Sequence, residues 1–313
     1  MYFCTFKKNM KSKSLLTGHI ACFSAYLIFG INLVGCKSLA NANLISPIGL
    51  FCLRSFFATC LFWLLSLFLP KEKVEKKDLL RIFFASMLGL YVTQLSFLKA
   101  ITVTTPLDAS ILASFSPILT MFVAAVYLKE PITLKKAGGV LLSFGGVFLL
   151  LFNSVHIGGG VDHTEPFGVL MMVCNCLAFA LYLGLFKPLI AKYKVVTFMK
   201  WMFLFSMLAS VPFDLRELVS IHYTSLPLPF LRSLIFLVVF ATFVAYFLIP
   251  LGQKTLRPTL VSMYSYVQPL IAAIISIIFG MDVLNWQKLT AAALVFGGVV
   301  LVNRSRAAEH VKN

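Results

Sequence analysis

Apolar residues along this chain come in runs of about twenty, separated by short polar segments. A helix needs a run of that length to cross roughly 30 Å of hydrocarbon. Inside lipid the backbone must satisfy its own hydrogen bonds, which favours helices. The pattern predicts an all-α membrane protein with ten transmembrane helices. The predicted spans are 16–36, 47–69, 79–99, 105–128, 134–153, 166–186, 196–213, 230–250, 258–280 and 287–303.

Charge gives the direction of these spans. The net charge is +16, which on its own would raise a nucleic-acid partner as an alternative. However, 21 of the 27 Lys and Arg residues lie in the N-terminal segment or in other segments predicted on the same side of the membrane. Five lie in segments on the opposite side, and Arg54 lies within a span. Positive loops remain on the cytoplasmic side of a membrane. We therefore expect both termini to be cytoplasmic, membrane lipids rather than nucleic acid as partners, and a bacterial inner (plasma) membrane location.

The chain contains an internal repeat. Residues 97–150 align with 249–302 at a constant offset of 152, and near the start of each half an offset of 150 aligns Gly18, Phe29 and Lys37 with their equivalents Gly168, Phe179 and Lys187. The predicted domains are a five-helix repeat over 1–153, a linker over 154–165 and a second repeat over 166–313.

Five is an odd number of spans, so the second repeat enters the membrane from the opposite side. Inverted repeats are the usual construction of secondary transporters, whose substrate site lies near the membrane midplane at the repeat interface. The sequence therefore predicts a transporter that moves a small metabolite by alternating access. Without a nucleotide-binding segment, transport would be driven by an ion or by exchange.

In its amino-acid sequence, the chain resembles the drug/metabolite transporter superfamily, specifically its EamA-type members. The resemblance covers essentially the whole chain and is clearest over Phe97–Pro131, where a Lys-Ala step, a Thr-rich turn and a Ser-rich helix precede Leu128-Lys129-Glu130-Pro131, and over Gly138–Gly146. Asp282 stands where the family usually shows Glu. The resemblance implies ten helices, a central cavity and export or exchange of metabolites such as amino acids; it implies no particular substrate.

Polar residues within spans are costly and are candidates for lining a wet cavity. Several fall at equivalent positions of the two repeats, such as Gln94 with Tyr246 and Ser116 with Gln268. The alternative is that each group forms hydrogen bonds between helices and stabilises packing. The predicted substrate-cavity residues are Asn32, Arg54, Tyr91, Gln94, Asp108, Ser116, Asn175, Tyr182, Tyr246, Tyr264 and Gln268.

Two charged residues in or near spans have competing interpretations. Arg54 could neutralise a substrate carboxylate, or it could pair structurally or extend to the outer interface. Asp108 could titrate as a proton-coupling or cation-binding group, or it could favour a helix start through the helix dipole. Both alternatives remain open from the sequence.

Other features are structural candidates. The residues Pro106, Pro117, Pro258 and Pro269 could loosen or kink their helices during gating, or could simply be tolerated in membrane helices. Glu130 is expected to pair with Lys135 or Lys136, and Thr133 to cap the fifth span. Gly-Gly pairs and Ala291-Ala292-Ala293 in the fifth and tenth spans permit close packing, within the fold or in a homo-oligomer.

An integral-membrane enzyme or a receptor without transport is the alternative class. An enzyme would need convergent catalytic groups, yet the five histidines are scattered, and no metal-ligand spacing, phosphate loop or nucleophile elbow occurs. Cys174 and Cys176 could suggest a metal pair, but two positions apart on a helix they face different directions, so buried free cysteine is the preferred interpretation. We expect no enzyme activity, no cofactor and no metal.

Overall fold

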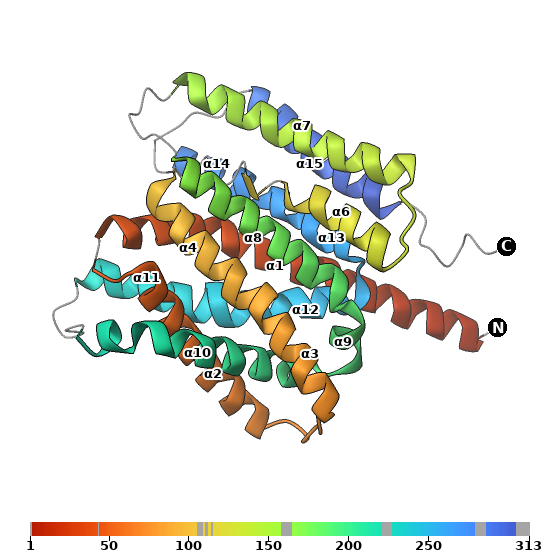
Figure 1. The fold of residues 1–313 in the computed structure, drawn as a ribbon. Coiled ribbons are helices and arrows are strands. Elements are labelled where there is room, and N and C mark those ends of the chain that lie inside the picture. The colour runs from red at the N-terminus through yellow and green to blue at the C-terminus, as the bar shows by residue number, and fades with distance from the viewer. Residues whose placement is uncertain are drawn as a thin grey trace.

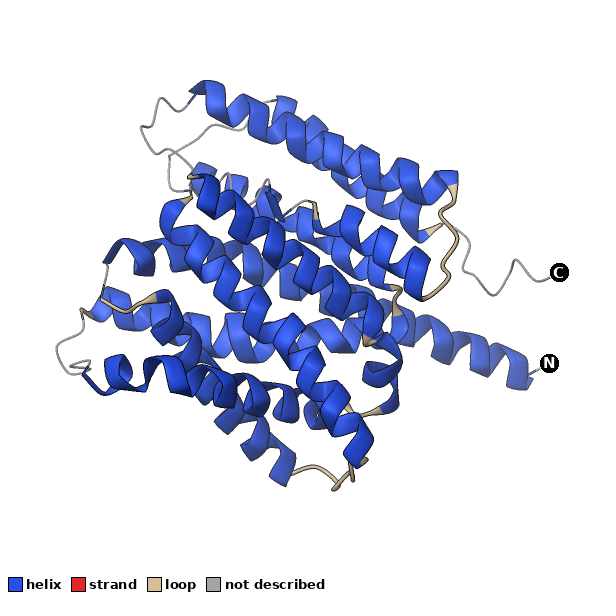
Figure 2. Ribbon diagram, viewed as in Figure 1, coloured by secondary structure: helices blue, strands red, loops and turns tan. Residues whose placement is uncertain are grey.

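A computed structural model describes residues 2–42, 44–104, 109, 112–113, 115–157, 165–220, 227–278 and 286–304. The regular elements within these ranges are all helical (Figure 2). In chain order they are α1 (Tyr2–Ala42), α2 (Pro47–Leu67), α3 (Lys76–Ser86), η1 (Met87–Val92), α4 (Thr93–Val103), α6 (Ser116–Tyr127), α7 (Leu134–Ile157), α8 (Pro166–Leu185), α9 (Lys187–Lys192), α10 (Val195–Ser220), α11 (Leu228–Val238), η3 (Val239–Val244), α12 (Ala245–Thr255), α13 (Pro258–Met263), η4 (Tyr264–Tyr266), α14 (Val267–Ile278) and α15 (Trp286–Asn303).

Six stretches are long and apolar enough to cross a membrane, by length and composition, among the residues that the structure describes. They are Leu15–Lys37, Pro47–Leu67, Lys76–Val103, Pro166–Leu185, Val195–Pro212 and Leu228–Thr255. The chain is thus a multi-pass membrane protein. Most of the predicted linker lies outside the described residues, so the predicted domain boundaries remain a prediction.

The short connection between α6 and α7 is held by local hydrogen bonds. The backbone of Lys129 adopts a positive φ of 52°, and Glu130 N donates to Ala124 O (3.2 Å), which closes the end of α6. Thr133 Oγ1 then accepts from Lys136 N (3.2 Å) and caps α7, as predicted. The predicted ion pair also forms, because Lys136 Nζ lies 2.6 Å from Glu130 Oε2, with the Lys136 side chain 1% and the Glu130 side chain 9% exposed.

The two repeats also share a helical irregularity at equivalent positions. Within the third predicted span, η1 is a π-helical turn, and η3 is a π-helical turn within the eighth. The two turns, Met87–Val92 and Val239–Val244, are related by the same offset of 152 found in the sequence. Insertions of this kind leave carbonyl groups to be satisfied from elsewhere. Thr93 Oγ1 donates to Leu88 O (2.6 Å) and Thr242 Oγ1 to Leu237 O (2.7 Å).

The first helix of each repeat packs against the other repeat. Helix α1 contacts α12 and α14, and its equivalent α8 contacts α4 and α6. These contacts define a first helix group (α4, α6 and α8, continued by α9) and a second helix group (α12, α14 and α1). Helices α2 and α10 pack against each other beside both groups, and the central cavity lies between the groups.

Helices α7 and α15 form a separate pair along one side of the bundle (Figure 1). Small residues permit their close approach, because a Cβ at Gly139 would lie 2.7 Å from the carbonyl oxygen of Gly298. Part of the small-residue surface predicted for helices 5 and 10 is therefore used within the chain. Homo-oligomerisation through these helices remains a prediction.

Candidate functional site

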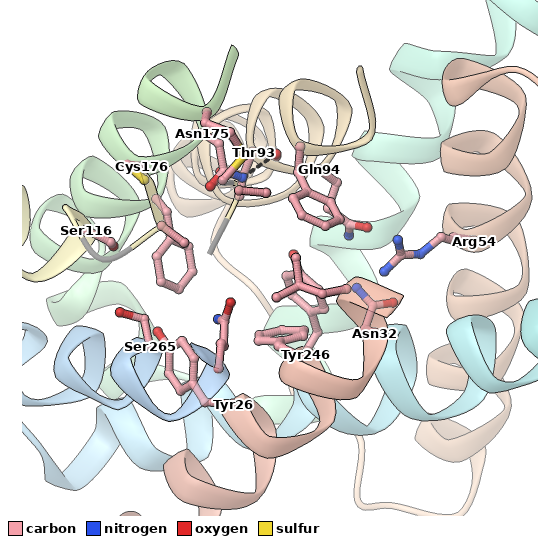
Figure 3. Close-up of a pocket in the computed structure, with 18 residues that line it drawn as sticks. Tyr26, Asn32, Arg54, Thr93, Gln94, Ser116, Asn175, Cys176, Tyr246 and Ser265 are labelled. Carbon is pink, nitrogen blue, oxygen red and sulfur yellow. Dashed lines mark hydrogen bonds between the residues drawn. The ribbon is translucent and has the colours of Figure 1, made fainter. Parts of the chain in front are cut away.

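A cavity of about 100 Å³ lies between the two helix groups near the middle of the bundle. Aromatic and other apolar side chains, including Phe29, Phe97, Met172 and Phe179, form much of its wall. A sulfhydryl, hydroxyls, amides and one guanidinium supply the rest (Figure 3). These polar lining residues are Tyr26, Asn32, Arg54, Thr93, Gln94, Ser116, Asn175, Cys176, Tyr246, Ser265 and Gln268.

Equivalent residues of the two repeats meet across this cavity. The offsets of 150 and 152 relate much of one wall to the other, although the side chains themselves differ. The related lining pairs are Tyr26 and Cys176, Phe29 and Phe179, Gln94 and Tyr246, Ala113 and Ser265, and Ser116 and Gln268. The cavity thus lies at the junction of the repeats, where inverted-repeat transporters place their substrate.

Arg54 is buried in the cavity wall, with 2% of its surface exposed. Its Nε donates to Thr242 Oγ1 (2.8 Å) on the π-helical turn η3. The side chain does not extend to the outer interface, which excludes that alternative. A buried cation beside an internal cavity favours an anionic ligand group, because such a group compensates the charge in a region of low dielectric constant.

Two cavity amides already have protein partners. Asn175 Nδ2 donates to Thr93 O (2.6 Å) on α4, and Asn32 Oδ1 lies 3.5 Å from the sulfhydryl of Cys36. These bonds fit the alternative that such residues stabilise helix packing. Asn175 links α8 to α4 within the first helix group, so it also fixes part of the cavity wall.

Other buried polar atoms of the cavity have no hydrogen-bond partner among the described residues. They are both amide atoms of Gln94, the hydroxyl of Tyr26 and the hydroxyls of Ser116 and Ser265. All four side chains are at most 4% exposed. Because a buried unpaired polar group is costly, these atoms are suited to bind a polar ligand or water.

Figure 3 shows that the polar groups are spread along the cavity, with Thr93 and Asn175 between its two ends. Arg54, Asn32 and Gln94 point toward one another at one end, whereas Ser116 and Ser265 lie at the other. The arrangement can bind a small molecule with polar groups at both ends. Each end includes an unpartnered group.

Of the eleven predicted cavity residues, seven line the cavity: Asn32, Arg54, Gln94, Ser116, Asn175, Tyr246 and Gln268. Three others lie elsewhere. The ring of Tyr91 packs edge-on against Phe51, and Tyr264 forms a hydrogen bond with His19 (2.6 Å). Tyr182 is buried against Gly89, where a Cβ would overlap its ring. The remaining predicted residue, Asp108, lies outside the described residues.

Sequence reasoning missed several lining residues, notably Tyr26, Thr93 and Ser265. Tyr26 lies six residues before Asn32 and is turned about 120° from it around the helix, so helical periodicity from Asn32 alone does not indicate it. Ser265 follows Tyr264 directly, but the chain there forms the 3₁₀ turn η4, which changes the face that each residue presents.

Three of the predicted hinge prolines stand at helix starts. Pro117 and Pro258 lie in the first turns of α6 and α13, and Pro269 lies in the first turn of α14. Proline is tolerated there because those N–H groups have no partner within the helix. Pro106 lies outside the described residues, and a gating role for all four remains a prediction. Two further prolines lie inside helices, Pro212 in α10 and Pro250 in α12.

Cys174 and Cys176 are both free; Cys174 is exposed and Cys176 is buried. No group of three or more His, Cys, Asp or Glu residues that could hold a metal occurs in the part of the chain that the structure describes.

The sequence matches the model of the EamA-like transporter family twice, over residues 16–152 and 166–304. An uncharacterized transporter of Archaeoglobus fulgidus is 23% identical over 266 residues, which cover 85% of this chain and 92% of the relative. The uncharacterized transporter YetK of Bacillus subtilis is 24% identical over 229 residues, 72% of this chain and 68% of that protein.

A solved crystal structure with 16% sequence identity has the same fold, with a TM-score of 0.71 over 96% of this chain and 99% of that one. The two family matches together span most of the chain, and each covers one of the repeats that meet at the cavity. This protein is therefore a transporter that belongs to the EamA-like transporter family.

Proposed function

We propose that the chain is a secondary transporter that moves a small, amino-acid-like solute through the central cavity by alternating access, as an exporter or an exchanger. The observation that carries this proposal is the meeting of equivalent residues, such as Gln94 and Tyr246, across one cavity at the repeat junction. Symmetry of this kind lets one sequence adopt two related conformations, each open to one side of the membrane.

The proposed topology has ten spans in two inverted five-helix repeats, with both termini cytoplasmic. Six of these spans coincide with the helical stretches already named. The others would be formed by the region ending in α6, by α7, by α13 with α14, and by α15. The uneven distribution of 27 Lys and Arg residues supports the orientation. A bacterial inner membrane is the proposed location, supported by the bacterial relative.

The proposed substrate carries a carboxylate and a second polar group. Arg54 and Gln94 would bind the carboxylate, because a guanidinium and an amide N–H both donate to carboxylate oxygens. The hydroxyls of Ser116, Ser265 and Tyr26 would bind a hydroxyl or amino group at the other end. A volume of about 100 Å³ favours a small solute, since an engineered cavity of about 150 Å³ holds benzene.

The coupling mechanism is a separate proposal. Asp108, next to the cavity-lining residue Ala109, would titrate as the proton-coupling or cation-binding group. An Asp108→Asn variant should then lose the dependence of transport on a pH gradient. Retention of full, gradient-dependent activity by this variant would exclude the coupling role and leave a helix-start role.

The test is counterflow of labelled solutes into proteoliposomes that contain the purified protein. The panel comprises small neutral amino acids, small hydroxy acids and their amides. We expect saturable counterflow of carboxylates, little for the amides, and a loss of about tenfold or more in Arg54→Met. Arg232→Met, which removes an exposed arginine on α11, is the matched control and should retain activity. Equal activity of both variants would exclude carboxylate recognition by Arg54, and the absence of carrier-dependent flux for every solute would contradict the proposed substrate class.

A further inference from the structure

A lysine of the first repeat binds the carboxyl end of a helix. Lys37, near the end of α1, donates from Nζ to the carbonyl oxygens of Ile101 (3.2 Å) and Thr104 (2.9 Å). These carbonyls belong to the last turn and C-cap of α4. The carboxyl end of a helix carries partial negative charge and unpaired carbonyl groups, so an ammonium group is a favourable partner there.

The second repeat has the same arrangement. Lys187, at the start of α9, donates from Nζ to the carbonyl oxygens of Gln253 (3.3 Å) and Leu256 at the end of α12. The offset of 150 that relates the first helices of the repeats relates the two lysines, and the offset of 152 relates both pairs of acceptors. The bonds are therefore one feature of the fold, present twice.

Each lysine joins the two helix groups. Lys37 lies on α1 of the second helix group and binds α4 of the first. Lys187 lies on α9 of the first helix group and binds α12 of the second. The ends of α1 and α4 lie at one end of the bundle, and α9 with the end of α12 lies at the other (Figure 1). One such joint thus stands at each end of the cavity.

At the same helix ends, the contacts within a group are of a different kind. A Cβ at Gly168 of α8 would overlap the Thr104 side chain, and a Cβ at Gly18 of α1 would overlap Thr255. The backbone also contributes, because Glu165 N donates to Val103 O (3.1 Å) between α8 and α4. Close backbone packing resists separation, whereas a lysine side chain can release its carbonyl acceptors and turn toward water.

We propose that Lys37 and Lys187 are the two gate residues of the transport cycle, one at each membrane face. Each lysine holds the helix groups together at its own end, and its bonds break when the cavity opens to that side. This inference rests on the proposed alternating access. In the structure both lysines are bonded, which in this scheme means that neither gate has released its helix end. In the proposed orientation Lys37 is the periplasmic gate and Lys187 the cytoplasmic gate.

The two gates differ in strength. At the cytoplasmic end, Gln253 Nε2 also donates to Leu183 O (2.7 Å) on α8, which adds a further bond between the helix groups. The equivalent residue at the other end is Ile101, whose side chain has no donor. Loss of Lys37 should therefore open the periplasmic end of the cavity more than loss of Lys187 opens the cytoplasmic end. Gln253→Leu should also favour opening of the cytoplasmic end, as Lys187→Met does.

The gates can be tested with a cysteine of the natural chain. Cys176 lines the cavity as a free thiol, and Cys22 is buried outside it. A membrane-impermeant maleimide is added to right-side-out or inside-out vesicles that contain the full chain. The labelled fraction of each cysteine is then measured by peptide mass spectrometry, with Cys22 as the control for unfolding.

We expect Lys37→Met to raise Cys176 labelling from the periplasmic side and Lys187→Met to raise it from the cytoplasmic side, each roughly tenfold. Lys37→Arg and Lys187→Arg keep the charge and donors and should label as the unmodified chain does. If the lysines only cap helices and do not act as gates, Cys176 labelling should change equally from both sides of the membrane or not at all. Either result would overturn the proposal. If Lys187→Met raises Cys22 labelling and is thus misfolded, Gln253→Leu gives the same directional test. Labelling requires no solute, so a failure of counterflow would count against the proposed function alone.

Discussion

The Nε atom of Arg54 donates a hydrogen bond of 2.8 Å to the Oγ1 atom of Thr242, across 188 residues of sequence. The bond joins α2 to the π-helical turn of the other repeat, and the guanidinium points toward the cavity (Figure 3). Thr242 itself donates to Leu237 O, five residues earlier. The irregular turn thus supplies a hydrogen-bond acceptor for the buried arginine. A π-helical turn, which both repeats have, therefore helps to position the Arg54 cation in the cavity wall.

Removing this acceptor should weaken the site without removing its charge. In Thr242→Val the isosteric side chain leaves the Arg54 Nε without that partner, and we expect a loss of stability of about 1–3 kcal/mol together with weaker transport. Thr59→Val is the matched control, because its hydroxyl bonds a carbonyl of its own helix (Ser55 O, 2.7 Å). Thermal unfolding in detergent measures the effect. Equal shifts for both variants would mean that the bond between the repeats adds no net stability.

Two cavity amides should respond oppositely to replacement by leucine. Gln94 has two buried amide atoms without a partner in the described structure, so Gln94→Leu should raise the melting temperature, since an apolar group removes a desolvation cost of about 1–3 kcal/mol. The same variant should lose transport. Asn175→Leu breaks a bond of 2.6 Å to Thr93 O and should lower the melting temperature. A lower melting temperature for both would show that Gln94 is satisfied in the protein.

Much of this architecture could be predicted from the sequence because two periodicities are explicit in it. Apolar run length indicated the helices, and the offset of 152 paired Ser116 with Gln268 and Gln94 with Tyr246, all of which line the cavity. Positions related by a repeat occupy related sites even where their side chains differ. That reasoning needs only regular helices and a constant offset.

The prediction was less accurate where the helices are irregular. Tyr91 lies within the π-helical turn and Gln94 lies after it, so the two do not present the faces that a regular helix would give them. Tyr182 aligns with the cavity residue Asn32, but its larger ring packs over Gly89. Neither a π-helical turn nor a local change in packing has a clear signature in one sequence.

The buried ion pair between Glu130 and Lys136 should matter more than the exposed ones. Both of its side chains are at most 9% exposed, and removing one partner of such a pair leaves a buried charge uncompensated, at a cost of about 3–5 kcal/mol. We expect Lys136→Met to lower the melting temperature strongly. The double variant with Glu130→Gln should recover part of the loss, because it leaves no unpaired charge.

The control for that pair is Glu75→Gln. Glu75 lies 2.7 Å from Lys192, but its side chain is 67% exposed. Solvent and salt screen a pair of this kind, so we expect a small shift that disappears at high salt. A shift as large as that of Lys136→Met would contradict the assignment of stability to burial.

Adjacent glycines of α7 test how α7 and α15 are held together. A Cβ at Gly139 would lie 2.7 Å from the Gly298 carbonyl oxygen and 3.0 Å from Val302 N, both backbone atoms, whereas a Cβ at Gly138 would meet only Leu301 at 3.9 Å. Alanine favours helix over glycine by about 1 kcal/mol. Gly138→Ala should therefore raise the melting temperature slightly, and Gly139→Ala should lower it because the two backbones must separate. Since α7 and α15 lie beside the helix groups rather than around the cavity, transport per folded molecule should change little in either variant. A loss of transport in folded Gly139→Ala protein would show instead that this helix pair takes part in the movement of the groups.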